Sequence, residues 1–258
     1  MADITTKYKS KFTGAEIDAK LERQTNPNLL DNWYFGNPVN QRGQTEYSGV
    51  VYGIDRWKTN FSSDKVIVTE NGVKNVNAST STGWHLHQVR NVPATSISGD
   101  MITLSVWITE RQGDRLKPIV SFRDASDSEI SALTFTAISN GVNSVSKKMP
   151  AGTAKIRVGL YAASGVAAGD YTTMLAAKLE LGAQQTLAHQ DADGNWVLNE
   201  IPNYAEELAK CQRYYQLFSS EAARPAALAD YRPLMRITPA TGTIVIDGVT
   251  YYYADANL

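Results

Sequence analysis

His85 and His87 have a spacing that metal sites can use. On a β-strand, side chains two residues apart project from one face, so both imidazoles would be available to a single ion. No cysteine, third histidine or obvious acidic ligand lies nearby in the sequence, and Trp84 directly precedes the pair. We therefore interpret this segment as a polar strand face, and we predict neither a metal site nor a cofactor.

Aromatic side chains beside polar groups suggest a second kind of chemistry. An exposed ring can stack on the apolar face of a sugar while neighbouring side chains bond to its hydroxyls. Trp84 follows the polar run 77–83, and Trp107 lies opposite an aliphatic strand face. Trp84, His85, His87 and Trp107 are therefore the candidate ligand-binding residues. A core or interface role remains the default interpretation for each single tryptophan.

Catalytic motifs are absent from the sequence. There is no Gly-x-Ser-x-Gly elbow and no phosphate-binding glycine loop. Four carboxylates could supply a glycosidase pair, namely Glu46, Asp55, Asp100 and Glu110. Asp191, Asp193 and Asn195 surround Gly194 like a calcium loop, but the distant Glu of that pattern is missing, so we expect a surface turn. We predict no catalytic residue and no enzymatic activity.

Composition excludes several classes of protein. The chain has 258 residues, 43% of them hydrophobic, and a net charge of −1. The longest basic run is Lys147-Lys148, which argues against nucleic-acid binding. No stretch approaches the roughly 20 apolar residues of a membrane span, and the N-terminus has no apolar run typical of a signal peptide. Cys211 is the only cysteine, which fits folding in a reducing cytoplasm.

The first element is predicted to be a short helix from Thr13 to about Arg23. Thr13 and Glu16 form a capping box, and Ile17 and Leu21 make the only apolar stripe. About three turns of helix are too few to be stable alone. We therefore expect residues 1–27 to serve attachment or oligomerisation.

Residues 28–182 have the alternation of β-strands. Ile102, Leu104, Val106 and Ile108 share one face, and Ile156, Val158 and Leu160 share another. Further short segments of this kind are separated by Gly, Asn, Asp and Ser, without a convincing helix. The region is predicted to be an antiparallel jelly-roll or β-sandwich. Residues 183–202 are then expected to form a linker or turn.

Residues 203–258 are predicted to form a small module of a helix and a β-hairpin. The helix is expected to carry an apolar stripe at helical spacing, made by Tyr204, Leu208, Cys211, Tyr215 and Phe218. In the hairpin, Asp247-Gly248 forms a two-residue turn that pairs Ile246 with Val249 and Ile244 with Tyr251. The candidate residues for an oligomer or assembly interface are Ile17, Leu21, Tyr204, Leu208, Tyr215 and Phe218.

Several of these segments resemble proteins of bacteriophage tails. The segments 28–35, 37–43 and 54–57 are similar to the opening of modules common in phage and prophage tail proteins, and 177–182 to the last strand of that module. The module is itself similar to jelly-roll carbohydrate-binding modules. The most specific match is 207–216, which resembles the C-terminal regions of tail-fibre and receptor-binding proteins, while 12–18 resembles N-terminal segments of baseplate proteins.

The resemblance implies a protein that binds a bacterial surface receptor, with a glycan as the expected ligand. It also implies a homotrimer in contact with other tail or baseplate proteins, made in the bacterial cytoplasm and carried in the virion. A purely structural subunit and a short polysaccharide depolymerase are the alternatives. Related carbohydrate-binding modules often have an acidic calcium ligand after the first Phe, but here Gly36 follows Phe35.

Overall fold

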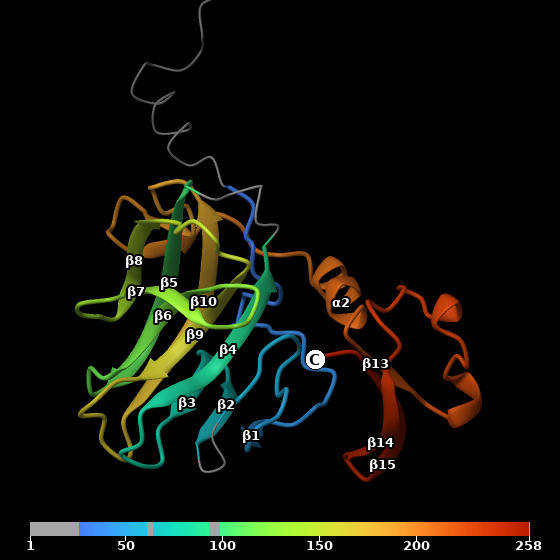
Figure 1. Ribbon diagram of the computed structural model, residues 1–258. Coiled ribbons are helices and arrows are strands. Elements are labelled where there is room, and N and C mark those ends of the chain that lie inside the picture. The colour runs from blue at the N-terminus through green and yellow to red at the C-terminus, as the bar shows by residue number, and fades with distance from the viewer. Residues whose placement is uncertain (1–25, 61–63, 93–98, 258) are drawn as a thin grey trace, which may run out of the picture.

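The computed structural model describes residues 26–60, 64–92 and 99–257. The predicted helix at 13–23, with Ile17 and Leu21, lies outside these residues. Within them the protein is mainly antiparallel β, with one α-helix and a C-terminal sheet built on a β-hairpin (Figure 1). This confirms the predicted fold class of a jelly-roll or β-sandwich with a small α+β module. No helix in the described ranges is long and apolar enough to cross a membrane.

Two antiparallel sheets form the sandwich. The larger sheet has the strand order β1 (Glu46–Ser48), β2 (Lys65–Thr69), β3 (Gly72–Val76), β10 (Tyr171–Leu181), β5 (Met101–Gln112) and β8 (Gly141–Lys148). The smaller sheet has the order β4 (Gly83–Asn91), β9 (Lys155–Ala162), β6 (Leu116–Arg123) and β7 (Glu129–Thr134).

The core lies between these sheets and follows the predicted alternation. The predicted inward faces of β5 and β9 are almost fully buried in one apolar cluster. The outward residues of β9, Lys155, Arg157 and Tyr161, are half-buried. The outer face of the smaller sheet is therefore polar, and it is available for contacts other than core packing.

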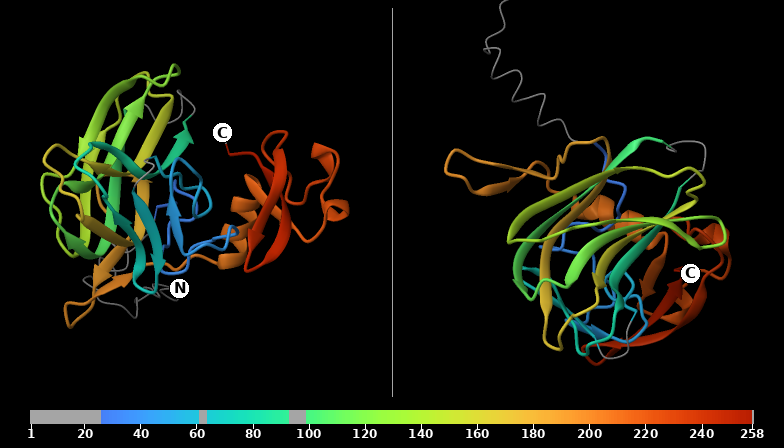
Figure 2. Two further views of the ribbon diagram at one scale, coloured as in Figure 1. Left: turned by 90° about the horizontal axis from the view of Figure 1, so that it is seen from below. Right: turned by 60° about the vertical axis from the view of Figure 1, so that its left-hand side comes forward.

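A segment that is irregular apart from β1, residues 26–60, covers one side of the sandwich. We call it the irregular segment. Its first part runs beside β10, where Leu29 N donates to Leu179 O at 2.8 Å and Phe35 N to Leu175 O at 2.8 Å. Trp33 and Trp57 are in the core, and Trp57 Nε1 donates to Asn32 O at 2.9 Å. This segment separates the sandwich from the C-terminal module (Figure 2).

The residues expected to form a linker contain a small hairpin of their own. Strands β11 (Ala188–Gln190) and β12 (Trp196–Leu198) pair antiparallel. At the tip, Asp191 Oδ1 accepts hydrogen bonds from the backbone N–H groups of Asp193 and Asn195. These contacts are those of a turn, as we expected for the acidic loop.

The C-terminal module combines a helix with a three-stranded sheet. Helix α2 (Tyr204–Gln212) is followed by β13 (Tyr215–Phe218), two short 3-10 helices η1 (Glu221–Ala223) and η2 (Leu228–Asp230), β14 (Ala240–Ile246) and β15 (Val249–Asp255). The hairpin has the predicted register, and both turn residues, Asp247 and Gly248, have positive φ. Asn203 caps the helix by accepting from Ala205 N.

The predicted helical stripe is wrong beyond Cys211. The helix ends at Gln212, and Tyr215 and Phe218 lie on β13, which pairs with β15. The run from Tyr214 to Phe218 is rich in aromatic residues, which favour strands, and the open edge of β15 supplies the hydrogen bonds that a longer helix would have made. Local periodicity could not reveal that edge.

Candidate functional site

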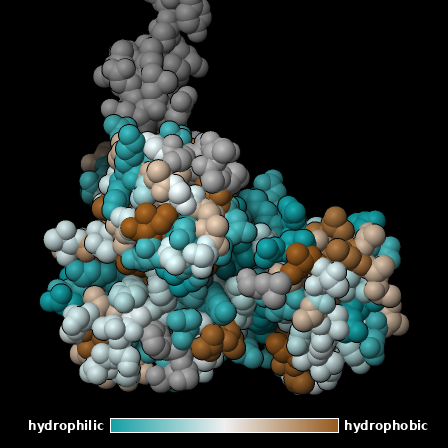
Figure 3. Space-filling model, in the orientation of Figure 1, coloured by the Kyte–Doolittle hydropathy of each residue, from teal (hydrophilic) through white to brown (hydrophobic). Residues whose placement is uncertain are grey.

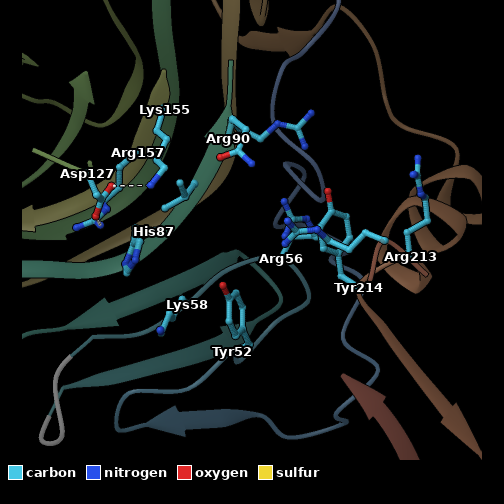
Figure 4. Close-up of a pocket in the computed structure, with 13 residues that line it drawn as sticks. Tyr52, Arg56, Lys58, His87, Arg90, Asp127, Lys155, Arg157, Arg213 and Tyr214 are labelled. Carbon is cyan, nitrogen blue, oxygen red and sulfur yellow. Dashed lines mark hydrogen bonds and ion pairs between the residues drawn. The ribbon is translucent and has the colours of Figure 1, made fainter. Parts of the chain in front are cut away.

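A pocket of about 660 Å³ lies where the sandwich, the irregular segment and the C-terminal module meet. This volume is within the range of small-ligand sites, roughly 300–1,000 Å³. The side chains that line it are Tyr52, Arg56, Lys58, His87, Val89, Arg90, Asn91, Asp127, Lys155, Arg157, Arg213, Tyr214 and Arg236 (Figure 4). Hydrophilic residues gather where the sandwich faces the module (Figure 3).

Four parts of the chain build the pocket. Strands β4 and β9 contribute the outer face of the smaller sheet, with His87 and Val89 on β4 and Lys155 and Arg157 on β9. The irregular segment contributes 52–58, the turn after β6 contributes Asp127, and the module contributes 213–214 and Arg236. In Figure 4, Tyr214 lies against Arg56, and Arg213 extends from the module on the side opposite the sheet.

Cations dominate the lining. Among the described residues, seven lining side chains are Lys or Arg, namely Arg56, Lys58, Arg90, Lys155, Arg157, Arg213 and Arg236, and Asp127 is the only lining carboxylate. Asp127 Oδ2 lies 3.2 Å from Arg157 Nη2, and Oδ1 lies 3.9 Å from Lys155 Nζ. Arg123 Nε also donates to Asp127, at 3.0 Å.

Asp31 neutralises two further guanidinium groups from behind the pocket. Its Oδ2 accepts from Arg56 Nε at 3.0 Å and from Arg90 Nη1 at 2.5 Å. The Arg56 guanidinium also stacks 3.4 Å above the Tyr214 ring. Arg56 is therefore fixed between the sandwich and the module, and it positions one wall of the pocket.

The remaining cations face carboxylates less closely. Within the described part of the chain, no carboxylate oxygen lies within 4.0 Å of the charged nitrogens of Lys58, Arg213 or Arg236. Lys58 Nζ lies 5.6 Å from the centroid of the Tyr52 ring, and the Arg236 guanidinium carbon 5.5 Å from that of Tyr214. Arg213 and Arg236 are exposed to solvent.

His87 is a pocket residue, and Trp84 lies next to it. A bulge shifts the β4–β9 register between Trp84 and His87, which places Trp84 opposite Tyr161 and His87 opposite Gly159. A Cβ at position 159 would come within 2.6 Å of His87 Cα, so glycine is required for this approach. The Trp84 and His87 rings are 5.7 Å apart, and the Arg157 guanidinium lies 5.4 Å from the Trp84 ring.

The electrostatics of His87 follow from its burial. Burial is the main cause that lowers the pKa of His87 to about 4; the hydrogen bond to His85 O opposes it, and the cations Arg157 and Lys58 act in the same direction as burial. The imidazole is therefore neutral at pH 7 and can either donate or accept a hydrogen bond. Burial, and next the Arg123 guanidinium, also lower the pKa of Arg157.

The other two candidate ligand-binding residues lie away from the pocket. The fully buried His85 ring nitrogen Nε2 is 3.0 Å from Asp64 Oδ2 and 2.9 Å from Asn77 Oδ1. The expectation that His85 and His87 share one strand face is wrong, because the bulge interrupts the alternation. Trp107 is half-buried on β5, in the other sheet. The structure therefore brings together only His87 and Trp84 of the four candidates.

The four carboxylates considered for catalysis do not assemble in the pocket. Asp100 and Glu110 lie at opposite ends of β5, on the order of 30 Å apart at the rise of a strand. Asp55 is buried, and its carboxylate accepts from Gln41 N at 2.7 Å, while Glu46 pairs with Lys65 at 2.7 Å. Across the ranges that the structure describes, no group of three or more His, Cys, Asp and Glu side chains could hold a metal ion.

The predicted interface residues of the module have different surroundings. Tyr204 is 44% exposed, whereas Leu208 and Phe218 are half-buried. Phe218 packs on Tyr231 in the module's own small core. Tyr215 is buried under Arg42 of the irregular segment, with the guanidinium carbon 3.7 Å from the ring centroid.

Polar contacts join the module to the irregular segment. Asn32 N donates to Glu207 Oε2 at 2.7 Å, and Gln41 Nε2 donates to Tyr215 O at 2.9 Å. The Arg42 guanidinium lies 3.1 Å from an Asp255 oxygen. Together with the Arg56–Tyr214 stack, these contacts hold the pocket walls in one arrangement.

Most pocket residues were not candidates on sequence grounds. Tyr52, Lys58, Arg157 and Arg213 come from segments far apart in the chain, and no local pattern connects them. One signal was present in the sequence, because Lys155 and Arg157 alternate with the core residues of β9 and so share its outer face.

No family model and no curated protein matches the sequence. Among solved structures, one that is similar is the complex of accessory secretory proteins 1, 2 and 3 of Streptococcus pneumoniae. The identity is 11% and the TM-score 0.38, over 59% of this chain and 97% of that chain. A structure described as "CBM4 structure and function" has 15% identity and a TM-score of 0.38, over 59% and 99%. Tailspike protein 4 of bacteriophage CBA120, in its enzymatically active domain, has 15% identity and a TM-score of 0.31, over 60% and 21%. None of these similarities assigns a family or a ligand to the chain.

Proposed function

We propose that this chain is a receptor-binding protein of a bacteriophage or prophage tail, and that it binds a glycan of the bacterial surface. The tail-protein part of the proposal rests on the sequence segments 28–35 and 207–216. The same residues have structural roles here, since Trp33 is in the core and Glu207 docks the module. The proposed setting is a homotrimer in the virion, in contact with other tail or baseplate proteins.

The pocket between the sheet and the module is the observation that supports glycan binding. It offers two aromatic rings, Tyr52 and Tyr214, among many hydrogen-bond donors. Sugars are bound by this combination, with a ring against the apolar sugar face and polar groups on the hydroxyls. Rigid positioning by Asp31 and Glu207 lowers the entropic cost of ordering these groups on binding.

Binding without cleavage is part of the proposal. Glycosidases use two carboxyl groups on either side of the scissile bond. The described pocket lining supplies one, Asp127, and both of its oxygens are engaged by Arg157, Arg123 and Lys155. A carboxylate whose two oxygens are both engaged by cations is not free to act as a nucleophile, and the described lining holds no second carboxyl group.

A glycan array tests this function. The purified full chain would be applied to immobilised capsular, lipopolysaccharide and teichoic-acid glycans, beside Tyr52→Ala and the control Tyr251→Ala. Tyr251 is a half-buried tyrosine on β15, outside the pocket lining. We expect the wild type and Tyr251→Ala to bind the same glycans and Tyr52→Ala to lose them. Absence of binding by the wild type to every bacterial glycan, or release of reducing sugar from a bound one, would contradict the proposal.

A further inference from the structure

The pocket concentrates positive charge that the rest of the chain balances. The protein has 25 Lys and Arg residues against 26 Asp and Glu residues, so its net charge is close to zero. In the part of the chain that the structure describes, seven of those cations nevertheless line one pocket of about 660 Å³, together with a single carboxylate. Like charges held this close repel one another, and an anionic partner removes that repulsion.

Three of these cations are free to take such a partner. In the described structure Lys58, Arg213 and Arg236 have tyrosine rings or solvent beside them and no carboxylate within 4.0 Å. Arg157 adds a fourth donor, because its Nε is buried without a hydrogen-bond partner. A buried donor without a partner costs free energy unless a ligand supplies the acceptor.

The arrangement of these groups suits an oxyanion. Guanidinium groups present planar forks of N–H donors that match the two oxygens of a carboxylate or phosphate, and a lysine adds a point charge. Lys58 and Arg157 belong to the sandwich side of the pocket, while Arg213 and Arg236 belong to the module. A ligand with charged groups along its length would therefore contact both parts of the molecule at once (Figure 4).

We propose that the ligand of this pocket is an acidic glycan, whose phosphate or carboxylate groups are bound by Lys58, Arg157, Arg213 and Arg236 while Tyr52 and Tyr214 contact the sugar rings. This inference rests on the proposed glycan binding and narrows its ligand class. A nucleic acid is the less suitable polyanion, since its backbone needs a basic track and the sequence has no basic run longer than Lys147-Lys148.

Matched pairs of glycans test the inference. The first pair is an oligogalacturonate and its carboxyl-reduced neutral galactan, and the second is a phosphorylated oligomannose and its dephosphorylated form. Binding of the full chain would be measured by calorimetry, with a single-stranded oligonucleotide as a fifth probe. We expect at least one acidic member to bind about ten-fold or more tightly than its neutral counterpart, because only the acidic member accepts charge-assisted hydrogen bonds through an anionic group. A difference within the galacturonate pair would identify carboxylate as the anionic group of the ligand, and a difference within the mannose pair would identify phosphate.

Charge-removing variants locate the contact. Arg213→Gln combined with Arg236→Gln removes two of the four proposed anion-binding groups and is expected to abolish the preference for the acidic member. Both side chains are exposed, so they can be changed without unfolding the chain. The control combines Arg115→Gln with Lys148→Gln, which removes the same charge from exposed positions outside the pocket and is expected to leave binding unchanged.

The outcomes separate this inference from the proposed function. Equal affinity for the acidic and neutral members of both pairs would overturn the inference and leave glycan binding intact. Equal loss of binding in the pocket variant and the control variant would overturn it as well, as would tighter binding of the oligonucleotide than of any glycan. A chain that binds none of the four glycans overturns the inference, while the broader array decides the proposed function independently.

Discussion

Neutral His87 surrounded by cations makes stability sensitive to acid. Its pKa is about 4 in the folded protein, against 6.5 for an unperturbed histidine. Between these pH values the unfolded chain binds a proton that the folded chain does not, so the free energy of unfolding decreases as the pH falls from about 6.5 towards 4. The loss reaches roughly 3 kcal/mol at most.

We predict that His87→Gln removes this acid sensitivity. Urea unfolding at several pH values between 4 and 7 would measure it in both proteins. Burial raises the pKa of Asp55 to about 6. Asp55 therefore acts in the opposite direction, because it lowers the free energy of unfolding as the pH rises from about 4 to 6. Because Asp55 titrates in both proteins, the difference between them isolates His87. A difference that does not change with pH would show that His87 has the same pKa in the folded and the unfolded protein.

Trp84 and Trp57 provide a matched test of which aromatic residues form the core. Trp57 is fully buried in the main apolar cluster, whereas Trp84 is buried to 9% exposure outside that cluster and contacts His87 and Tyr161. We expect Trp57→Ala to lower the free energy of unfolding by about 3–5 kcal/mol, and Trp84→Ala to lower it by less than half as much. Equal losses in thermal or urea unfolding would identify Trp84 as a core residue.

At the scale of elements, Glu207 carries much of the docking of helix α2. Its carboxylate accepts from Asn32 N at 2.7 Å and from Lys210 Nζ at 2.5 Å, and it is buried. Glu207→Ala leaves the Asn32 N–H without a partner, so we expect a loss of about 1–3 kcal/mol in urea unfolding. Glu206→Ala, on the exposed side of the same helix turn, is the control and should stay within about 0.5 kcal/mol of the wild type. Equal effects would contradict the docking role.

The elements themselves were largely predictable, and their assembly was not. The alternation in 102–108 and 156–160 identified the inward faces of β5 and β9, and Asp247-Gly248 identified the hairpin turn. The end of α2 was missed because β13 depends on the edge of β15, some 35 residues later in the sequence. The bulge in β4 was missed for a similar reason, since its cause is the pairing with Gly159.

The candidate site shows the same division between local and long-range information. Trp84 and His87 could be identified as candidates from the sequence, because an aromatic residue lies beside polar residues within one short segment. The pocket also needs Tyr52, Arg157 and Arg213, which only the fold brings together. Sequence patterns report periodicity over a few residues, whereas a pocket at a junction depends on contacts between distant segments.

At the scale of the whole molecule, we predict a homotrimer. The exposed Tyr204 on α2 and the predicted helix at 13–23, outside the described residues, are surfaces that a neighbouring chain could cover. Light scattering of the purified chain at micromolar concentration should return three times the chain mass. A monomer mass would contradict this prediction, and the pocket would then act as a single site without the avidity of three copies.

The central claim is that a glycan binds where the sandwich meets the C-terminal module. Hydrogen–deuterium exchange with and without the best array glycan tests it most directly, because residues 49–60 and 210–216 are separate peptides that both line this pocket. The account predicts that exchange slows in both segments together, while the β11–β12 tip, 190–196, is unchanged. Slower exchange confined to other loops of the sandwich, with 49–60 and 210–216 unaffected, would contradict it.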